Sequence, residues 1–103
     1  MTVATDTEVK LDEKIEKVIH DPGKYHVIFL NDNQTPMEFV IEILKSIFKH
    51  SDKTAQDIML SIHNTGSAVV GIYTYEIAEQ RAVEATTLSR DNGFPLQLKV
   101  EKE

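Results

Sequence analysis

The stretch YHVIFLNDNQTPMEFV, residues 25–40, contains the pattern that decides the fold. Its first six residues are rich in aromatic and β-branched side chains, which predicts a buried strand. Four polar residues, 31–34, then form a loop. A helix start follows, with Thr35 as the N-cap, Pro36 at the first helical position and Glu38 closing a capping box. These sixteen residues therefore predict a strand, a polar loop and a helix.

Apolar residues continue with helical spacing along the rest of the chain. The helix that begins at residue 36 is expected to bury Met37, Val40, Ile41, Leu44, Ile47 and Phe48. A second helix is predicted over about 52–64, with Gly66 as its stop, and it would bury Ala55, Ile58, Met59 and Ile62. A third is predicted from near Thr74 to near Gly93, with an inward stripe of Ile77, Ala78, Ala82, Ala85 and Leu88. Strands are predicted over 68–73 and 95–100.

The predicted order is therefore β-α-α-β-α-β. This order indicates an α+β fold in which three helices pack on a small, three-stranded, mainly antiparallel sheet. Residues 1–24 contain no aromatic residue and are predicted to be a flexible extension of a core domain spanning 25–103. Within the extension, helical spacing of Leu11, Ile15, Val18 and Ile19 leaves two interpretations open, a frayed segment or one that orders on a partner.

Composition excludes several classes of protein. The chain has 103 residues, of which 41% are apolar, so one globular domain is expected. A net charge of −6 argues against nucleic acid as a partner, since phosphates require a basic face. Cysteine is absent, which excludes disulfides, thiolate metal sites and a Cys nucleophile. No apolar run is long enough for a membrane span and no signal core is present, so a cytoplasmic protein without a membrane partner is expected.

Signatures of enzymes are scarce. The four glycines do not form a phosphate-binding loop, no Ser lies in a nucleophile elbow, and no two His have the i, i+4 spacing of metal ligands. Asn31, Asn33, Thr35 and Glu42 imitate the spacing of a calcium loop, but Pro36 occupies the position that needs Gly. The sequence thus predicts a protein that is not an enzyme and that has no metal or cofactor.

One cluster of residues suggests a binding site. Asn31, Asp32 and Asn33 lie where the first strand gives way to a helix, and His63 lies at the end of the second helix. Taken singly, each of these residues has an ordinary structural explanation. Asn31 and Asp32 are typical of a turn, and His63 is typical of a helix terminus. Met37 and Met59 are typical of core filling. Together they suggest a polar rim beside a flexible apolar pocket, which suits a ligand with a cationic head and a hydrophobic body.

The sequence closely resembles the ClpS adaptor family over 25–103. The resemblance is carried by residues 25–40 and by the later segments MLSIH at 59–63, GIYTYEIAE at 71–79 and PL at 95–96. It implies a non-enzymatic adaptor that binds proteins whose first residue is Leu, Phe, Tyr or Trp. Such an adaptor delivers them to a Clp-class AAA+ unfoldase, ClpA or ClpC, and its peptidase.

The resemblance also implies roles for particular residues. Asn31 and His63 would hydrogen-bond the substrate's α-amino group. Position 33, commonly Asp in the family and Asn33 here, would assist them, and Asp32 would add negative charge. The positions that match the side-chain pocket are Leu30, Thr35, Met37, Val40, Met59, Ile62 and Leu96, with Met37 as the gatekeeper against β-branched residues. Glu76 and Arg81 match positions that face the unfoldase's N-terminal domain, and the family commonly has Lys at position 81. The extension matches, by position only, a segment that the unfoldase engages during hand-over of the substrate.

A ribosomal stalk-type factor-binding domain is the alternative. It shares the predicted order of elements and the acidic balance, and it would bind translation factors through a helix face. It would not need the cluster of Asn31 and His63 or the pocket with Met37. In either case a monomer is expected.

Overall fold

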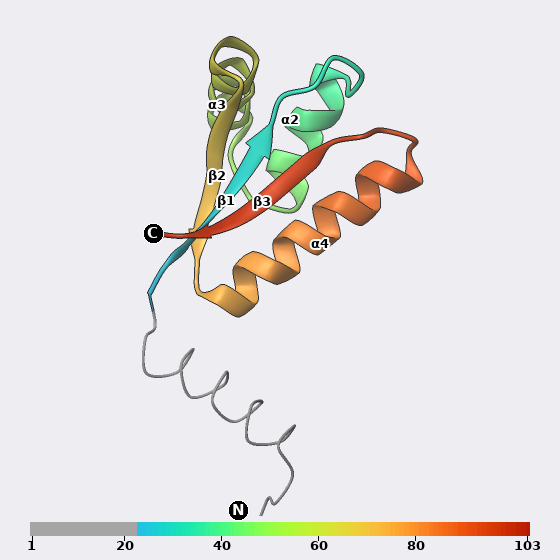
Figure 1. Ribbon diagram of the computed structural model, residues 1–103. Coiled ribbons are helices and arrows are strands. Elements are labelled where there is room, and N and C mark those ends of the chain that lie inside the picture. Colours follow the sequence, from blue (N-terminus) through green and yellow to red (C-terminus); the bar gives the residue numbers. More distant parts are fainter. Residues whose placement is uncertain (1–22) are drawn as a thin grey trace, which may run out of the picture.

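The computed structural model describes residues 23–103, and its elements have the predicted order (Figure 1). They are β1 (Tyr25–Leu30), α2 (Met37–Ser46), α3 (Asp52–Thr65), β2 (Ser67–Tyr73), α4 (Tyr75–Asp91) and β3 (Gln97–Lys102). The β-α-α-β-α-β prediction is confirmed, and each element lies within two residues of its predicted ends. The amphipathic segment of Leu11 to Ile19 lies outside the described residues, and the boundary near residue 24 stays a prediction.

The sheet has the order β2-β1-β3, and both neighbouring pairs are antiparallel. Strand β1 is central, with Tyr25 opposite Tyr73 of β2 and Leu30 opposite Ser67. A β-bulge interrupts this pairing between Val27 and Ile28. Because β1 is hydrogen-bonded on both sides, its carboxyl end is a fixed point from which the following loop departs.

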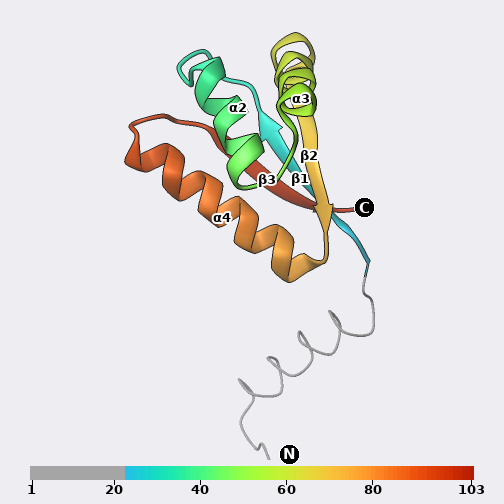
Figure 2. The ribbon, with the colours of Figure 1, turned by 180° about the vertical axis from the view of Figure 1, so that it is seen from behind.

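The three helices cover one face of the sheet. Figures 1 and 2 show the sheet from either side, with α2 in front of the strands in Figure 2. Alternate residues of β1, Val27 and Phe29, are buried beneath the helices. The buried hydrophobic core comprises Val27, Phe29, Val40, Ile43, Leu44, Phe48, Ala55, Ile62, Val70, Ala78, Ala85 and Leu96.

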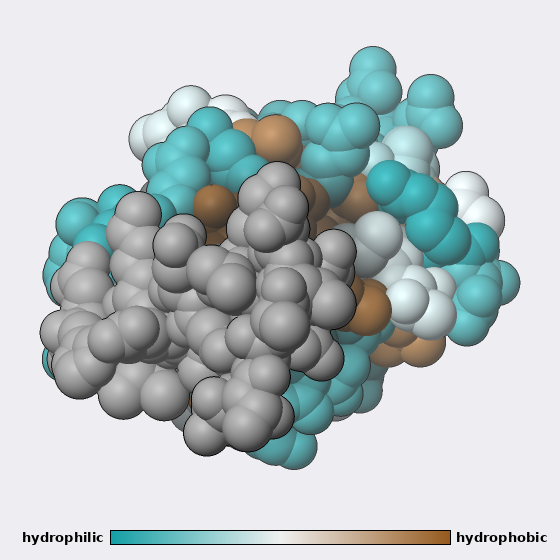
Figure 3. All heavy atoms as spheres, turned by 60° about the horizontal axis from the view of Figure 1, so that its bottom comes forward, coloured by the Kyte–Doolittle hydropathy of each residue, from teal (hydrophilic) through white to brown (hydrophobic). Residues whose placement is uncertain are grey.

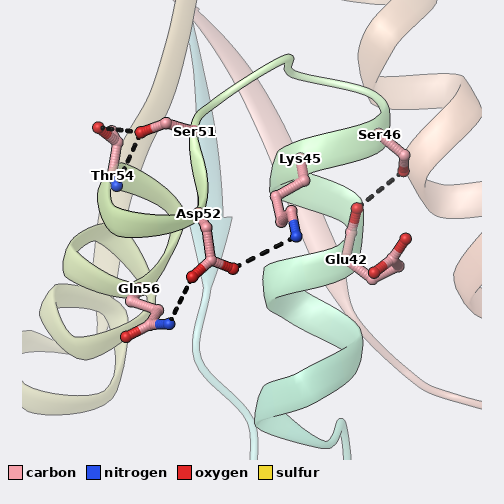
Figure 4. A network of polar contacts seen from close by, with 7 residues as sticks. All are labelled: Glu42, Lys45, Ser46, Ser51, Asp52, Thr54 and Gln56. Carbon is pink, nitrogen blue, oxygen red and sulfur yellow. Dashed lines mark hydrogen bonds and ion pairs between the residues drawn. The ribbon is translucent and has the colours of Figure 1, made fainter.

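Polar contacts join the end of α2 to the start of α3 (Figure 4). The Ser51 hydroxyl caps α3 by accepting from the Thr54 amide at 3.2 Å. Asp52 accepts from Lys45 Nζ at 3.3 Å and from Gln56 Nε2 at 2.9 Å, which links the two helices. This connection fixes α3 relative to α2, and the pocket described below lies between them.

Two sequence predictions about helix ends and faces are wrong. Pro36, not Thr35, is the N-cap of α2, and no side chain caps this helix. The Thr35 hydroxyl instead donates to Asp32, so the predicted capping box with Glu38 does not form. Local competition by a carboxylate three residues upstream explains this difference.

The predicted buried faces also need correction. Met37 is 44% exposed, and Ile77 and Leu88 are exposed as well, although all three were predicted to be inward. Ser89 is fully buried instead, with its hydroxyl donating to the Ala85 carbonyl at 2.8 Å. The buried residues of α4 are therefore small, which lets this helix approach the sheet closely. Ile43 is also fully buried and was missed.

The surface of the described part is mixed. Figure 3 shows hydrophobic residues reaching the surface in separate places among hydrophilic ones. No helix within residues 23–103 is long and apolar enough to span a membrane. The same residues contain no group of three or more His, Asp or Glu side chains that could hold a metal ion.

Candidate functional site

A cavity of about 360 Å³ opens at the carboxyl end of β1, between the start of α2 and the end of α3. Its size falls within the range of small-ligand pockets, roughly 300–1,000 Å³. It is lined by Asn31, Asp32, Asn33, Thr35, Pro36, Met37, Val40, Met59, Ile62 and His63. The structure thus brings together the predicted amine-binding and pocket residues, apart from two. Those two, Leu30 and Leu96, line a small adjoining cavity that shares Thr35, Val40 and Ile62 with the first.

The loop that forms the polar wall is organised by Asp32. Its Oδ1 accepts from the Gln34 amide at 2.8 Å and from the Thr35 amide at 2.7 Å, while its Oδ2 accepts from the Thr35 hydroxyl at 2.8 Å. Desolvation raises the pKa of Asp32, but these hydrogen bonds and the charge of Arg90 outweigh it, so the pKa lies below its usual value. Asp32 is therefore a carboxylate at neutral pH, and three of its lone pairs serve its own loop.

The two polar parts of the site are held together through Gly66. This residue ends α3 in the left-handed conformation, with φ of 94°, a conformation that side chains with a Cβ disfavour. Its carbonyl accepts from the Asn31 amide at 2.8 Å. The end of α3, which carries His63, is thereby fixed beside the start of the loop that carries Asn31.

The side chains at the mouth of the cavity are free to bind a ligand. Asn31, Asn33 and His63 are all exposed. Within residues 23–103, none of their side chains makes a hydrogen bond or ion pair. Their oxygen and nitrogen atoms therefore present unused acceptors and donors at the cavity mouth.

The inner wall of the cavity is apolar. Val40 of α2 and Ile62 of α3 are buried in the core and supply its fixed part. Met59 is half-buried, whereas Met37 stands exposed at the entrance. Unbranched thioether side chains adapt their shape at little cost, so the fixed inner wall is combined with an adaptable rim.

Pro36 also lines the cavity, and the sequence analysis missed it. Its place between Thr35 and Met37, both predicted to be pocket residues, is the signal that could have indicated it. Its fixed φ of −64° directs the chain from the loop into α2 and so orients the entrance.

Glu76 and Arg81 lie in the first half of α4, outside the lining of this cavity. They belong to α4, which begins after Tyr73, the partner of Tyr25 at the first residue of β1. The cavity is at the opposite end of β1, about 17 Å away along the strand. Arg81 donates to Glu84 at 3.1 Å, and Glu76 is exposed in the first turn. A role of these two residues in contacting an unfoldase stays a prediction.

Free acceptors beside an apolar cavity are suited to a primary ammonium attached to a hydrophobic group. Within residues 23–103, no Ser or Thr hydroxyl is hydrogen-bonded to a histidine.

Three comparisons with known proteins place this site in context. Residues 20–99 match the model of the family described as ClpS, ATP-dependent Clp protease adaptor protein. The ClpS adapter protein of Treponema denticola is 49% identical over 87 residues, covering 84% of this chain and 85% of that protein. The ClpS adapter protein of Sodalis glossinidius is 40% identical over 97 residues, covering 94% and 92%. The structure of Agrobacterium tumefaciens ClpS2 bound to L-phenylalaninamide superposes with a TM-score of 0.77 at 45% identity, covering 80% of this chain and 99% of that one.

Proposed function

The chain belongs to the ClpS family of ATP-dependent Clp protease adaptor proteins, and from this membership we propose that it binds N-degron proteins by their first residue. Proteins that begin with Leu, Phe, Tyr or Trp are the proposed substrates. One observation carries the proposal: free polar side chains and an apolar wall meet in a single cavity. The ligand in the similar ClpS2 structure, L-phenylalaninamide, combines a free α-amino group with an aromatic side chain.

The α-amino group is proposed to lie at the mouth of the cavity. The side-chain oxygens of Asn31 and Asn33 and the imidazole of His63 would accept its N–H groups. Because position 33 is an amide rather than a carboxylate, Asp32 is the nearest source of negative charge in the loop. Hydrogen bonds to a charged group contribute about 1.5–3 kcal/mol each, so the ammonium is a major part of the affinity.

The first side chain is proposed to enter the apolar part of the cavity. Burying a Leu or Phe side chain contributes roughly 1.5–3 kcal/mol. Association itself costs several kcal/mol in lost translational and rotational freedom. Neither half of the site therefore suffices alone, and the protein should require both a free amine and a large unbranched or aromatic side chain.

Delivery is proposed to use a separate surface. Glu76 and Arg81 of α4 would contact the N-terminal domain of a Clp-class AAA+ unfoldase, ClpA or ClpC. Because neither residue lines the cavity, this position supports simultaneous contact with substrate and unfoldase. Binding and delivery require no chemistry by the adaptor, and we propose that it acts as a monomer without a cofactor.

A titration with labelled peptides that differ only at the first residue tests this function. Peptides beginning with Leu or Phe should bind at least about tenfold more tightly than peptides beginning with Ile or Val, measured by fluorescence polarisation. A peptide with the same Leu moved to an internal position is the control and should not bind. Equal binding of all peptides, or of none, would overturn the proposed recognition of the first residue.

Met37 is expected to set the discrimination against β-branched first residues. Its exposed side chain stands at the cavity entrance, where a branched Cβ would crowd it. The substitution Met37→Ala should raise the affinity for Ile- and Val-first peptides by about five- to tenfold and lower that for Leu-first peptides by less. Leu60→Ala, which truncates another exposed apolar residue outside the cavity lining, is the matched control. A uniform loss of affinity in Met37→Ala would show that Met37 only contributes apolar contact.

A further inference from the structure

The guanidinium of Arg90 holds the segment that carries Leu96, a residue that lines the small cavity adjoining the binding cavity. Arg90 lies in the last turn of α4, and its Nη1 donates to the carbonyl of Phe94 at 2.8 Å and to that of Leu96 at 2.9 Å. Both acceptors lie in the connection between α4 and β3. One side chain thus fixes two carbonyls on either side of Pro95.

The rest of this connection does not depend on Arg90's side chain. The turn itself is formed by backbone bonds, with Gly93 at φ of 79° and the Phe94 amide donating to the Ser89 carbonyl at 2.9 Å. The Asn92 side chain also donates to the Leu88 carbonyl. Arg90 therefore acts on the part of the connection after the turn, which leads to the cavity.

That part of the connection carries two side chains that pack against the site. Leu96 is only 2% exposed and lines the small adjoining cavity together with Asp32, Thr35 and Val40. The ring of Phe94 packs edge-on against Phe39 of α2, with ring centroids 4.8 Å apart. A shift of the connection would therefore move Leu96 relative to α2 and change the depth of the pocket.

Arg90 also influences the polar wall of the site. Its positive charge is among the interactions that favour the carboxylate of Asp32, the residue that organises the loop with Asn31 and Asn33. The same cation therefore stabilises the pocket floor through hydrogen bonds and the amine-binding loop through its charge. Arg90 thus acts on one part of the site by hydrogen bonds and on the other by its charge, yet it lines neither cavity.

We propose that Arg90 is a positioning residue that fixes Leu96 as the floor of the side-chain pocket and thereby sets which first residues fit. This role rests on the proposed function. A floor held at a fixed depth matches a side chain of a given length, whereas a released floor leaves a void beneath a shorter one. Leu should then lose more affinity than Phe or Trp.

The test uses Arg90→Met, which keeps the apolar stem and removes the donors and the charge. Lys53→Met is the matched control, because it also replaces a cation that donates a hydrogen bond by Met, on an exposed helix face outside the cavity lining. Affinities for Leu-, Phe- and Trp-first decapeptides are measured by fluorescence polarisation, and amide hydrogen exchange at Leu96 and Gln97 is measured in the ligand-free protein.

We expect Arg90→Met to weaken Leu-first binding by about tenfold and Phe- and Trp-first binding by about threefold, with faster exchange at Gln97, the first residue of β3. Arg90→Lys, which keeps a cation with donors, should restore part of the selectivity, and Lys53→Met should change neither readout. Arg90→Gln serves as a milder variant should Arg90→Met not fold.

An equal loss for all three peptides, or wild-type exchange at Gln97, would overturn the positioning role. The proposed function fails separately, when the wild-type protein binds none of the peptides. In that case the exchange measurement still decides whether Arg90 holds the connection. Wild-type binding with unchanged selectivity in both Arg90 variants would remove the inference about Arg90 and leave the proposed function standing.

Discussion

Acetylating the terminal amine of a Leu-first peptide is expected to lower its affinity for this protein by at least about 100-fold. Acetylation removes the positive charge and replaces two or more N–H donors with a carbonyl oxygen. The side-chain oxygens of Asn31 and Asn33 would then face an acceptor in place of a donor, and groups left unpaired cost free energy. A 100-fold change corresponds to about 2.7 kcal/mol, which is within the contribution of one or two charge-assisted hydrogen bonds. Fluorescence-polarisation titration of the matched peptide pair measures the effect.

His63 provides the control for this prediction. His63→Ala should weaken every free-amine peptide by a similar factor, and acetylation should then cause a smaller further loss than in the wild-type protein, because both changes remove the same interaction. Binding should also fall above about pH 8 as the peptide's amine loses its proton. Tight binding of the acetylated peptide would refute the placement of the ammonium at Asn31, Asn33 and His63.

Asp32→Ala is expected to lower the affinity for Leu-first peptides by about 30-fold. The substitution removes three hydrogen bonds that fold the loop back on itself and also removes the loop's negative charge. Asn31 and Asn33 on either side of it would then sample several conformations before binding, which costs affinity. Titration of the variant with the same peptides measures the loss, and its thermal unfolding shows whether the fold remains intact.

Asp57→Ala is the matched control, since it removes one carboxylate from an exposed i, i+4 ion pair with Lys53 and leaves the cavity untouched. The pH dependence of the protein's stability is a second measure of how Asp32 organises the loop. Because the folded pKa of Asp32 lies below its usual value of 3.8, the stability that its hydrogen bonds contribute is present above that pH and is lost as the pH falls below it. Equal losses in Asp32→Ala and Asp57→Ala would mean that the overall negative field, and not the loop, accounts for the effect.

The order of the elements could be predicted from the sequence because apolar spacing and helix stops occur together. Gly66 and the apolar positions of α3 are an example, since both the helix and its end were located correctly. The grouping of Asn31 and His63 followed from their places at the ends of two elements and from the family resemblance. The structure brings them to one cavity, although their roles in binding stay predictions.

Other features depend on contacts that spacing along the chain does not reveal. Thr35 has the residue type and position of an N-cap, but its hydroxyl donates locally to Asp32, three residues upstream, and so does not cap the helix. Ser89 is buried because its hydroxyl bonds within its own helix, which no hydropathy pattern shows. Arg90 and Leu96 meet only because the chain reverses between α4 and β3, so their link to the cavity follows from the tertiary structure and not from the sequence pattern.

The bond from Asn31 to Gly66, together with the turn around Asp32, means that the cavity is already assembled before a substrate arrives. Encounter then requires no slow rearrangement, so substrates should be captured at similar rates whatever their first residue. Differences among them should appear as residence times. With an association rate constant of about 10⁶ M⁻¹s⁻¹, a dissociation constant of about 1 μM corresponds to a complex that lasts roughly one second. Each tenfold increase in affinity then lengthens that lifetime about tenfold. Selection by this adaptor would then be a matter of timing: a substrate is transferred when it stays bound longer than the unfoldase needs to engage it.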